Sequence, residues 1–335
     1  MQVLEYSTEE RKIKMNDLNE LLHKTNNHFN YAINRAIISG MLLANLNNSP
    51  KVFSSKEDFT QAYLDYTDSK YEQIVKKIQY SIQTTLAKLK SNQLFEAINT
   101  YGRLNTTELL KVLNAISDKH YFSNTNIDNG LDELMVKLAE VDPQDTILDP
   151  TSGFKGAWLK ILEENPHQTI TIQEIAPDLL ALAYLNARAA GADNFEIYQG
   201  DVLADPKYVS NKKLELFDKV ITFPPISLKL NKEAIDQNKF NRFRFGTIGI
   251  RADYAFISNA IASLKDKGKA VIAVADGPLF QAGSTGKIRQ NLVDDDLIEA
   301  VISLPDHMFI PAGVPINLLV INKDKHNFKG KIQFI

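Results

Sequence analysis

Residues 146–156 read Thr-Ile-Leu-Asp-Pro-Thr-Ser-Gly-Phe-Lys-Gly, and this stretch decides which fold the second half of the chain adopts. A short apolar run ends at Asp149, glycines follow at positions 153 and 156, and a segment with helical spacing begins directly afterwards. Glycines in such a turn let the backbone approach a ligand and leave the N–H groups of the helix start open to it. The stretch therefore predicts a ligand-binding turn at the carboxyl end of a strand.

From about residue 130 onward, strand-like and helix-like segments alternate along the chain. The strands are predicted at residues 146–149, 169–174, 195–198, 217–222, 270–274, 298–303 and 316–322. The helices are predicted at residues 156–164, 177–190, 252–264 and 287–293. Strands separated by helices are typical of a doubly wound α/β fold, whose mostly parallel sheet binds ligands at the carboxyl ends of its strands.

The last two of these strands differ from the others, because only a short loop with proline and glycine joins them. Two strands without an intervening helix predict a hairpin, which places one antiparallel strand at the end of the sheet. Residues 331–335 have the composition of the start of a further strand. We therefore expect the natural protein to continue beyond residue 335.

The first third of the chain differs from the rest in its composition and in the spacing of its apolar residues. Glycine and proline are scarce there, and apolar residues recur at helical spacing, for example at positions 74, 75, 78, 82, 86 and 89. We therefore predict two domains, a helical N-terminal domain at residues 1–120 and an α/β domain at residues 121–335.

Composition excludes several classes of protein. The 335 residues include no cysteine, which excludes disulfides and thiol nucleophiles, and the histidines lack metal-ligand spacing, so no metal site is expected. A net charge of −3 argues against binding nucleic acid through bulk charge but leaves room for a local basic groove. The charged N-terminus is unlike a signal peptide, and no apolar run is long enough to cross a membrane, so we expect a cytoplasmic protein.

Two acidic residues follow the glycine-rich turn at the ends of the next two predicted strands. Glu174 comes roughly 20 residues after the turn, the usual position of a carboxylate that holds ribose hydroxyls. Asp201 follows the third strand, where a carboxylate can accept a hydrogen bond from the exocyclic amine of an adenine ring. Each feature alone is common in α/β folds, but the ordered set of three indicates a site for a ligand that contains a nucleoside.

The fourth predicted strand ends in Phe223-Pro224-Pro225-Ile226. Consecutive prolines lock the backbone and hold its carbonyl groups in a fixed direction, as a flipped base requires. The same residues can also form an ordinary turn at the start of a loop, so the segment alone does not decide between the two interpretations.

A basic run with interleaved aromatic residues lies beyond this loop. Its cations are Lys239, Arg242, Arg244 and Arg251, and its aromatic residues are Phe240, Phe243 and Phe245. Positive charge combined with aromatic side chains suits contact with a nucleic-acid backbone and its bases. The alternative is a solvated loop whose aromatic side chains are buried.

Residues from about 130 to 325 resemble the catalytic domain of N6-adenine DNA methyltransferases, most closely the modification subunit of type I restriction–modification systems. The first family motif reads Asp-Pro-Ala-Cys-Gly-Ser/Thr-Gly-Gly, where this chain has residues 149–156, and the catalytic motif reads Asn-Pro-Pro-Phe or Tyr, where it has residues 223–226. The downstream motifs that resemble the family in order and spacing are Arg242–Gly246, Ala252–Phe256, Leu279-Phe280, Ile288-Arg289, Val301–Pro305 and Phe309. A terminal hairpin also separates methyltransferase-type sheets from fully parallel dinucleotide-binding folds.

The resemblance implies a class I S-adenosylmethionine-dependent methyltransferase fold, with S-adenosyl-L-methionine as cofactor and DNA as substrate. The residues that it assigns to the cofactor are Asp149, Gly153, Lys155, Gly156, Glu174 and Asp201. Those assigned to the target base, and therefore to catalysis, are Phe223, Pro224, Pro225 and Ile226. The basic side chains of Lys239, Arg242, Arg244 and Arg251 are expected to contact DNA. A separate specificity subunit is the expected partner, because modification subunits of this kind lack a target-reading domain.

Three motifs depart from the family pattern. Lys155 stands where the family has glycine, and its side chain either covers the cofactor site or meets the methionyl carboxylate. Phe223 replaces an asparagine whose side-chain oxygen accepts a hydrogen bond from the adenine amino group. Losing such a contact at the transition state costs a few kcal/mol, or roughly a hundredfold in rate. Residues 121–124 read Tyr-Phe-Ser-Asn instead of Phe-Tyr-Thr-Pro.

Three hypotheses about function stay open at this point. The first is methylation of adenine N6 in DNA with reduced activity, which Glu174, Asp201 and the downstream motifs favour. The second is a catalytically silent methyltransferase-fold protein that acts as a scaffold for DNA or a partner, which Phe223 and Lys155 favour. The third is a methyltransferase for a different substrate.

Overall fold

The computed structural model describes residues 30–48, 53–102, 104–122, 130–236, 238–246, 248–305, 315–326 and 328–335. The chain divides into two compact units, residues 1–122 and residues 123–335. Two parts of the predicted family motifs, residues 123–124 and Phe309, lie outside the described residues, as does most of the loop between the last two predicted strands.

The first unit is helical in the part that the structure describes. Its elements are α2 (Tyr31–Leu46), α3 (Lys56–Leu64), the 3-10 helix η1 (Ser69–Tyr71), α4 (Glu72–Leu86), α5 (Ser91–Tyr101) and α6 (Thr106–Phe122). The apolar spacing correctly predicted α4, whose buried face consists of Val75, Ile78, Ile82 and Leu86. Helix α2 is the center of the unit, because α3, α4 and α6 pack around it and bury a continuous run from residue 36 to residue 44.

The second unit is an α/β domain. Its strands are β1 (Thr146–Asp149), β2 (Thr169–Glu174), β3 (Phe195–Gln199), β4 (Val209–Ser210), β5 (Lys213–Leu214), β6 (Phe217–Thr222), β7 (Leu264–Ala275), β8 (Ile298–Ser303), β9 (Ile316–Asn322) and β10 (Gln333–Phe334). Its helices are α7 (Leu131–Ala139), α8 (Ala157–Glu164), α9 (Pro177–Ala189), α10 (Lys232–Asp236), α11 (Asp253–Ala262), α12 (Gly277–Phe280) and α13 (Ser284–Asp294), with the 3-10 helix η2 (Lys239–Asn241).

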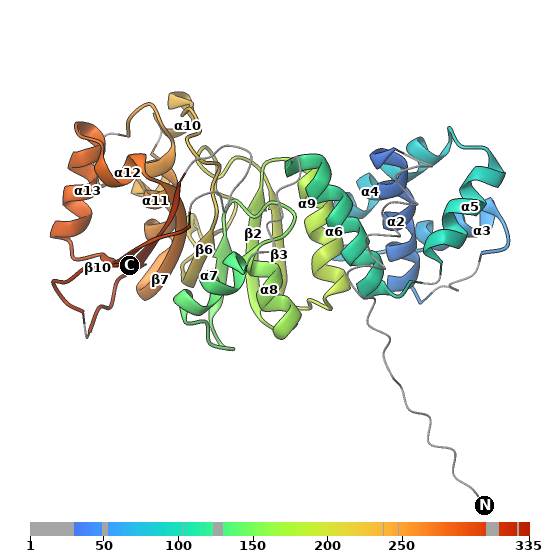
Figure 1. Ribbon diagram of the computed structural model, residues 1–335, viewed down its shortest axis with the longest axis horizontal. Helices are drawn as coiled ribbons and strands as arrows, with labels where there is room; N and C mark the ends of the chain where they lie inside the picture. Colours follow the sequence, from blue (N-terminus) through green and yellow to red (C-terminus); the bar gives the residue numbers. More distant parts are fainter. Residues whose placement is uncertain are drawn as a thin grey trace, which may run out of the picture. The chain divides into compact units, whose positions relative to one another are not determined.

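Eight strands form the main sheet in the order β10-β8-β9-β7-β6-β1-β2-β3 (Figure 1). Strand β9 is antiparallel to both of its neighbors, β7 and β8, and the other paired strands of this sheet are parallel. This arrangement confirms the predicted doubly wound, mostly parallel sheet with one antiparallel strand near its end. The short strand β10 confirms the strand expected at residues 331–335 and pairs with β8.

The largest difference from the predicted elements concerns β7, which begins at Leu264 rather than at residue 270. Leu264 pairs with Phe217 at the start of β6, so the strand includes the polar residues 265–269 that follow. Residues 265–268 have no register partner in β6, because the register shifts between Phe217 and Lys219, and several of their side chains face solvent. Hydropathy therefore does not mark them as part of a strand. Helix α11 accordingly ends at Ala262, before the predicted end at residue 264.

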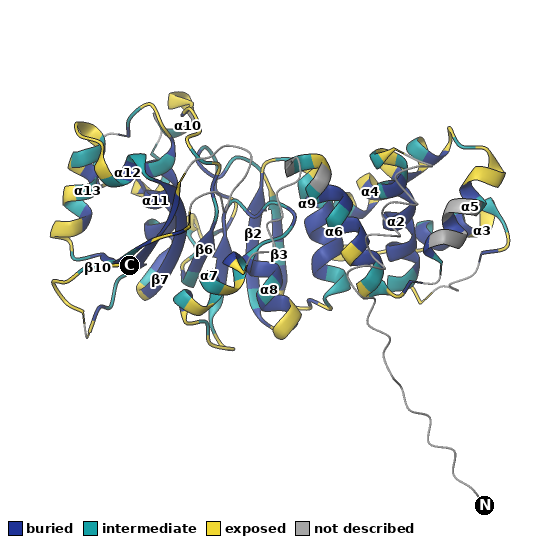
Figure 2. Ribbon diagram, viewed as in Figure 1, coloured by how far each residue is buried: buried dark blue, intermediate teal, exposed yellow. Residues whose placement is uncertain are grey.

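The core of the second unit lies on both faces of the sheet. Figure 2 shows the central strands as buried, with exposed residues mostly on the outer sides of the helices. The stretch 270–275 of β7 is completely buried, as expected for a strand covered by helices on both faces. Among the described helices, none has the length and apolarity needed to cross a membrane.

Candidate functional site

Four neighboring strands end at one edge of the sheet. Strands β6, β1, β2 and β3 lie side by side and are parallel, so their carboxyl ends face the same way. Asp149 ends β1 and Glu174 ends β2, while Asp201 and Phe223 closely follow β3 and β6. The predicted cofactor residues and the predicted target-base loop therefore share this carboxyl edge.

The glycine-rich turn after β1 is held by hydrogen bonds on two sides. The Ser152 N–H donates to the carbonyl of Gln173 in β2 (3.2 Å), and the buried Trp158 donates from Nε1 to the Ser152 carbonyl (3.1 Å). Gly153 has a φ of 59°, in the left-handed region where most side chains are strained. This conformation explains why a glycine stands at this position.

Glu174 is buried, and the backbone orients both of its carboxylate oxygens. Oε2 accepts a hydrogen bond from the Gly153 N–H at 2.9 Å, and Oε1 accepts one from the Ala176 N–H at 2.7 Å. The first of these bonds joins the end of β2 to the glycine-rich turn. Because a carboxylate oxygen has more than one acceptor position, Glu174 can also accept from the hydroxyl groups of a ligand.

Asp149 is almost completely buried and is bound by two threonines. Its Oδ1 accepts from Thr222 Oγ1 (2.8 Å) and from the Thr151 N–H (3.1 Å), and the two threonine hydroxyl oxygens lie 2.6 Å apart. Burial raises the pKa of Asp149 to about 7, although the bonds from Thr222 and Thr151 oppose the shift. Thr222 directly precedes Phe223, so this network connects the glycine-rich turn to the target-base loop.

Asp201 lies in a loop that is fixed to β2. Its Oδ1 accepts from the Leu203 N–H at 2.9 Å, and its backbone carbonyl accepts from the Asp205 N–H at 2.8 Å. The buried side chain of Gln173 donates to the carbonyls of Gly200 (3.2 Å) and Asp205 (3.1 Å). The carboxylate of Asp201 is therefore presented by a loop with a defined backbone.

Lys155 and Gly156 complete the turn before α8. Lys155 is partly buried, and its Nζ lies 6.0 Å from the centroid of the Phe154 ring. Gly156 is the N-cap residue of α8. Both positions lie on the turn that Glu174 contacts through Gly153, so they remain candidates for contact with a cofactor.

The side chains of the target-base loop differ in burial. Phe223 and Ile226 are partly buried, Pro224 is buried and Pro225 is exposed. Phenylalanine offers an aromatic face but no side-chain hydrogen-bond acceptor. The loop can therefore stack on a base, but the Phe223 side chain cannot accept a hydrogen bond from its amino group.

Arg251 and Asp253 contact the residue that follows this loop, whereas the sequence analysis named Arg251 only for contact with DNA. Arg251 NH1 donates to the Ser227 carbonyl, and Asp253 accepts a hydrogen bond from the Ser227 backbone. Burial raises the pKa of Asp253, while the backbone hydrogen bonds and the charge of Arg251 oppose the shift. A carboxylate and a guanidinium thus hold one side of the target-base loop.

The four basic residues do not converge on one surface. Lys239 Nζ lies 3.0 Å from Asp205 Oδ1, beside the loop that follows β3. Arg242 is only 1% exposed, and its guanidinium donates to the carbonyls of Val202 and Leu203. The expected contact of Arg242 with DNA does not fit this position, because the side chain lies inside the protein.

Arg244 lies toward the other edge of the sheet. Its NH1 is 3.7 Å from Asp295 Oδ2, and Asp295 stands shortly before β8 begins. The amino ends of β6, β7 and β8 share one edge because these strands are parallel, so Arg244 and Arg251 belong to opposite edges. Arg244 therefore does not join Arg251 at the target-base loop, as the sequence had suggested.

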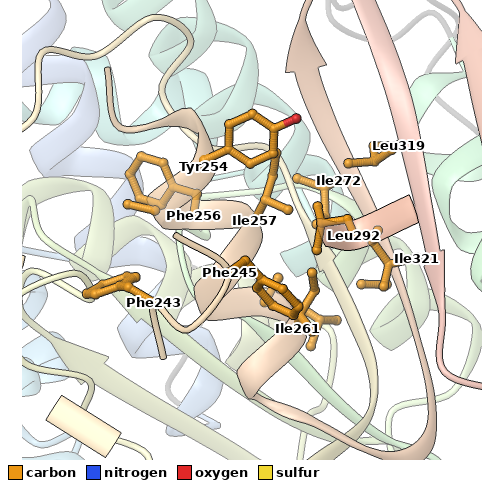
Figure 3. Packing of buried hydrophobic residues seen from close by; sticks show 14 of the residues in the cluster. Phe243, Phe245, Tyr254, Phe256, Ile257, Ile261, Ile272, Leu292, Leu319 and Ile321 are labelled. Carbon is orange, nitrogen blue, oxygen red and sulfur yellow. The ribbon is translucent and has the colours of Figure 1, made fainter. Parts of the chain in front are cut away.

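Two aromatic residues of the basic run belong to the core. Phe243 and Phe245 are buried, and Figure 3 shows both among the residues of the hydrophobic cluster of the second unit. Phe240 is 39% exposed and stays accessible to a ligand. The alternative of a loop with buried aromatic side chains thus holds for Phe243 and Phe245.

Several residues of the carboxyl edge were missed by sequence reasoning. Thr222 and Gln173 are buried polar side chains at strand ends, and this contrast with their apolar neighbors is the signal that could have identified them. Ile175 directly follows Glu174 and is 62% exposed, which places an apolar side chain next to the buried carboxylate. An exposed isoleucine after a strand-end acid is a further signal of a site.

A family model described as N-6 DNA Methylase matches residues 125–335. The methylase subunit of the type I restriction enzyme MjaVIII from Methanocaldococcus jannaschii is 28% identical over 320 residues, which cover 85% of this chain and 54% of that protein. The methylase subunit of the type I restriction enzyme MpnII from Mycoplasma pneumoniae is 25% identical over 84% of this chain and 55% of that protein. The chain thus spans about half the length of these curated relatives.

The fold is also found among solved structures. The type I restriction–modification system methyltransferase subunit from Streptococcus thermophilus matches with a TM-score of 0.68 and 15% identity, over 96% of this chain and 87% of that chain. At this identity the likeness concerns the fold, which is the class I S-adenosylmethionine-dependent methyltransferase fold that the sequence predicted.

Proposed function

We propose, because this chain belongs to the N-6 DNA methylase family, that it acts as the modification subunit of a type I restriction–modification system and methylates adenine N6 in DNA. The observation that carries the proposal is the order of groups along the carboxyl edge. A glycine-rich turn, Glu174 and Asp201 follow three adjacent strands, and the target-base loop follows the fourth. Ligand sites in open α/β sheets lie at such an edge.

The residues present fit S-adenosyl-L-methionine as the cofactor. Glu174 is oriented by two backbone N–H groups and would accept from the ribose hydroxyls, and Asp201 would accept from the adenine amine. The exposed side chain of Ile175 offers an apolar surface for the adenine ring. Lys155 places a long, partly buried side chain on the same turn, where it would crowd the cofactor. When bound, the cofactor supplies a methyl group on a sulfonium, which is open to attack by adenine N6.

The target-base loop supports a slow reaction. Phe223 and the two prolines would hold a flipped adenine by stacking and by rigid backbone carbonyls. Without a side-chain acceptor at position 223, the developing charge on the amino group is stabilized less at the transition state, which costs roughly a hundredfold in rate.

DNA contact is assigned to two cations of the carboxyl edge, Lys239 and Arg251. Both are at least partly exposed, whereas Arg242 is buried and Arg244 lies toward the opposite edge. Two cations give weak, salt-sensitive and sequence-indifferent binding. Sequence recognition would therefore come from a separate specificity subunit, and the matched curated relatives carry the names of type I restriction enzyme methylase subunits.

Transfer of a labeled methyl group from S-adenosylmethionine tests this function. The wild-type chain and Phe223→Asn are compared on a duplex with adenine and on a control duplex with only G·C pairs, each with and without a specificity subunit. We expect slow, adenine-dependent formation of N6-methyladenine by the wild type and a rate at least about tenfold higher for Phe223→Asn. Wild-type transfer at the rate of Phe223→Asn would contradict the role given to position 223.

A catalytically silent scaffold is the second candidate, and the replacement of asparagine by Phe223 favors it. In that case the wild type binds DNA or a partner but transfers no label to adenine. The same assay separates the two candidates through the wild type, which transfers label slowly if it is a methyltransferase and not at all if it is a scaffold.

A further inference from the structure

Arg242 is one of the largest fully buried side chains among the described residues. Its hydrogen-bond acceptors belong to Val202, Leu203, Lys239 and Asn259. Its NH1 donates to the Val202 carbonyl (2.7 Å) and to Asn259 Oδ1 (2.7 Å), and its NH2 donates to the Leu203 carbonyl (2.6 Å). Its Nε donates to the Lys239 carbonyl at 3.1 Å. Each side of the guanidinium is thus bound, and no acceptor among these four is a carboxylate.

The bond to Val202 acts on the same peptide group that orients Asp201. The Val202 carbonyl and the Leu203 N–H belong to one planar peptide unit and point in opposite directions. Arg242 binds the carbonyl of this unit, and Asp201 Oδ1 binds its N–H at 2.9 Å. A rotation of the peptide plane would break both bonds, so Arg242 fixes the direction in which the Asp201 carboxylate is held.

We propose that Arg242 is a positioning residue for Asp201, and that it sets how well the site distinguishes adenine from a purine without the amino group. The proposal rests on the proposed function, in which Asp201 accepts a hydrogen bond from the cofactor adenine. The guanidinium fork holds two successive carbonyls and anchors them to Asn259 of α11, an arrangement that a single ammonium group cannot reproduce.

A pair of ligands that differ only at the purine amino group reports on this role. S-adenosylhomocysteine carries the amine, and its purine-riboside analogue carries a hydrogen in its place, so that it offers Asp201 no N–H donor there. We expect the wild type to prefer the adenine ligand at least tenfold, or by about 1.4 kcal/mol, in calorimetric titrations. Asp201→Asn gives the value of this ratio without the carboxylate.

Arg242→Lys is the test variant, and we expect it to lower the preference ratio about tenfold toward that of Asp201→Asn. Tyr208→Phe is the matched control. It removes a buried hydroxyl bound to Asn259 and Ser263 in the same network, but leaves the bonds from Arg242 to the two carbonyls. The control should lower the free energy of unfolding and keep the wild-type ratio of the two affinities, because a general loss of stability weakens the binding of both ligands equally.

Each outcome of these titrations supports or contradicts the positioning role of Arg242. A wild-type ratio retained in Arg242→Lys overturns the positioning role, as does a wild type that binds both ligands equally. A wild type that binds neither ligand removes the proposed function and this inference together. If Arg242→Lys does not fold, Asn259→Ala, which removes one acceptor of the guanidinium, takes its place and should lower the ratio about threefold. Asn259→Ala with the wild-type ratio would then overturn the proposal.

Discussion

The carboxyl edge of the sheet has two halves, one in which backbone N–H groups orient several carboxylates and one that exposes large apolar side chains. In the cofactor half, which consists of the turn 150–156 and the ends of β1 to β3, the carboxylates of Asp149, Glu174 and Asp201 each accept at least one backbone N–H. In the target half, which consists of residues 223–228 and 250–253, Leu228 is 45% exposed and Ile250 is 69% exposed.

This difference indicates which part of the reaction each half is built for. A small polar ligand needs acceptors whose directions are set in advance, and the cofactor half provides them. A base within a duplex needs an open apolar surface to enter, and the target half provides one. Because the Phe223 side chain offers no acceptor, the proposed function places the main loss of rate in the chemical step.

A large effect is expected from the two at least partly exposed cations of the carboxyl edge, Lys239 and Arg251. Lys239→Ala combined with Arg251→Ala should lower DNA affinity about tenfold or more at low salt and reduce the salt slope by about two, since two phosphate contacts are lost. Fluorescence anisotropy on unrelated duplexes at several salt concentrations measures both quantities. Cofactor affinity should change little, which would sharpen the separation of the two halves.

Arg244→Ala combined with Lys267→Ala is the control for this pair, because it removes the same charge toward the opposite edge of the sheet. The control should bind DNA like the wild type. Equal losses in the two double variants would show that net charge, and not the carboxyl edge, determines the affinity.

An effect of intermediate size is expected in the pH dependence of the free energy of unfolding, through Asp149. Asp149 has a pKa of about 7 in the folded protein against 3.8 for the free side chain, so between these values the folded state binds more protons. The free energy of unfolding contributed by this group is therefore highest at low pH and is lost as pH rises toward 7. Asp149→Asn cannot titrate but keeps an oxygen that can accept from Thr151 and Thr222.

Thermal unfolding of the wild type and of Asp149→Asn between pH 4 and pH 8 measures this contribution. The difference in stability between the two proteins should change with pH by about 1–3 kcal/mol in favor of the variant and level off above about pH 7. A constant difference over this range would mean that Asp149 is already charged in the folded protein.

The smallest effect is expected at Lys155. Phe154 and the backbone of the turn are fixed, so removing the lysine side chain opens space without moving the turn. We expect Lys155→Gly to tighten cofactor binding about threefold if the side chain crowds the site. Lys155→Ala separates the loss of the side chain from the added freedom of a glycine. Weaker binding by both variants would instead support contact between the ammonium group and the methionyl carboxylate.

Much of the fold could be predicted because local patterns coincide with the sheet. Strands β1, β2, β6, β8 and β9 have the predicted bounds, since each is rich in β-branched or other apolar residues and is followed by polar or turn residues. Asp149, Glu174 and Asp201 could be placed together for the same reason, because the ends of parallel strands share one edge. The start of β7 could not be predicted, because backbone pairing and not hydropathy extends it to Leu264.

The basic run shows that the sequence could not predict where the basic side chains lie in the fold. Lys239, Arg242 and Arg244 are close in sequence, yet one contacts the loop after β3, one is buried and one pairs with Asp295. Charge and spacing carry no information about the direction in which an irregular segment crosses a domain. Buried arginines such as Arg242 are rare, so its sequence context favored a surface position.

Calorimetric titration with S-adenosylhomocysteine tests the central claim that the cofactor half is intact. We predict saturable binding by the wild type and about a hundredfold weaker binding by Glu174→Ala, which loses the carboxylate that joins β2 to the glycine-rich turn. Glu164→Ala, which removes an exposed carboxylate at the end of α8, is the matched control and should bind like the wild type. No heat from the wild type at millimolar ligand, or equal affinity in Glu174→Ala, would contradict the account.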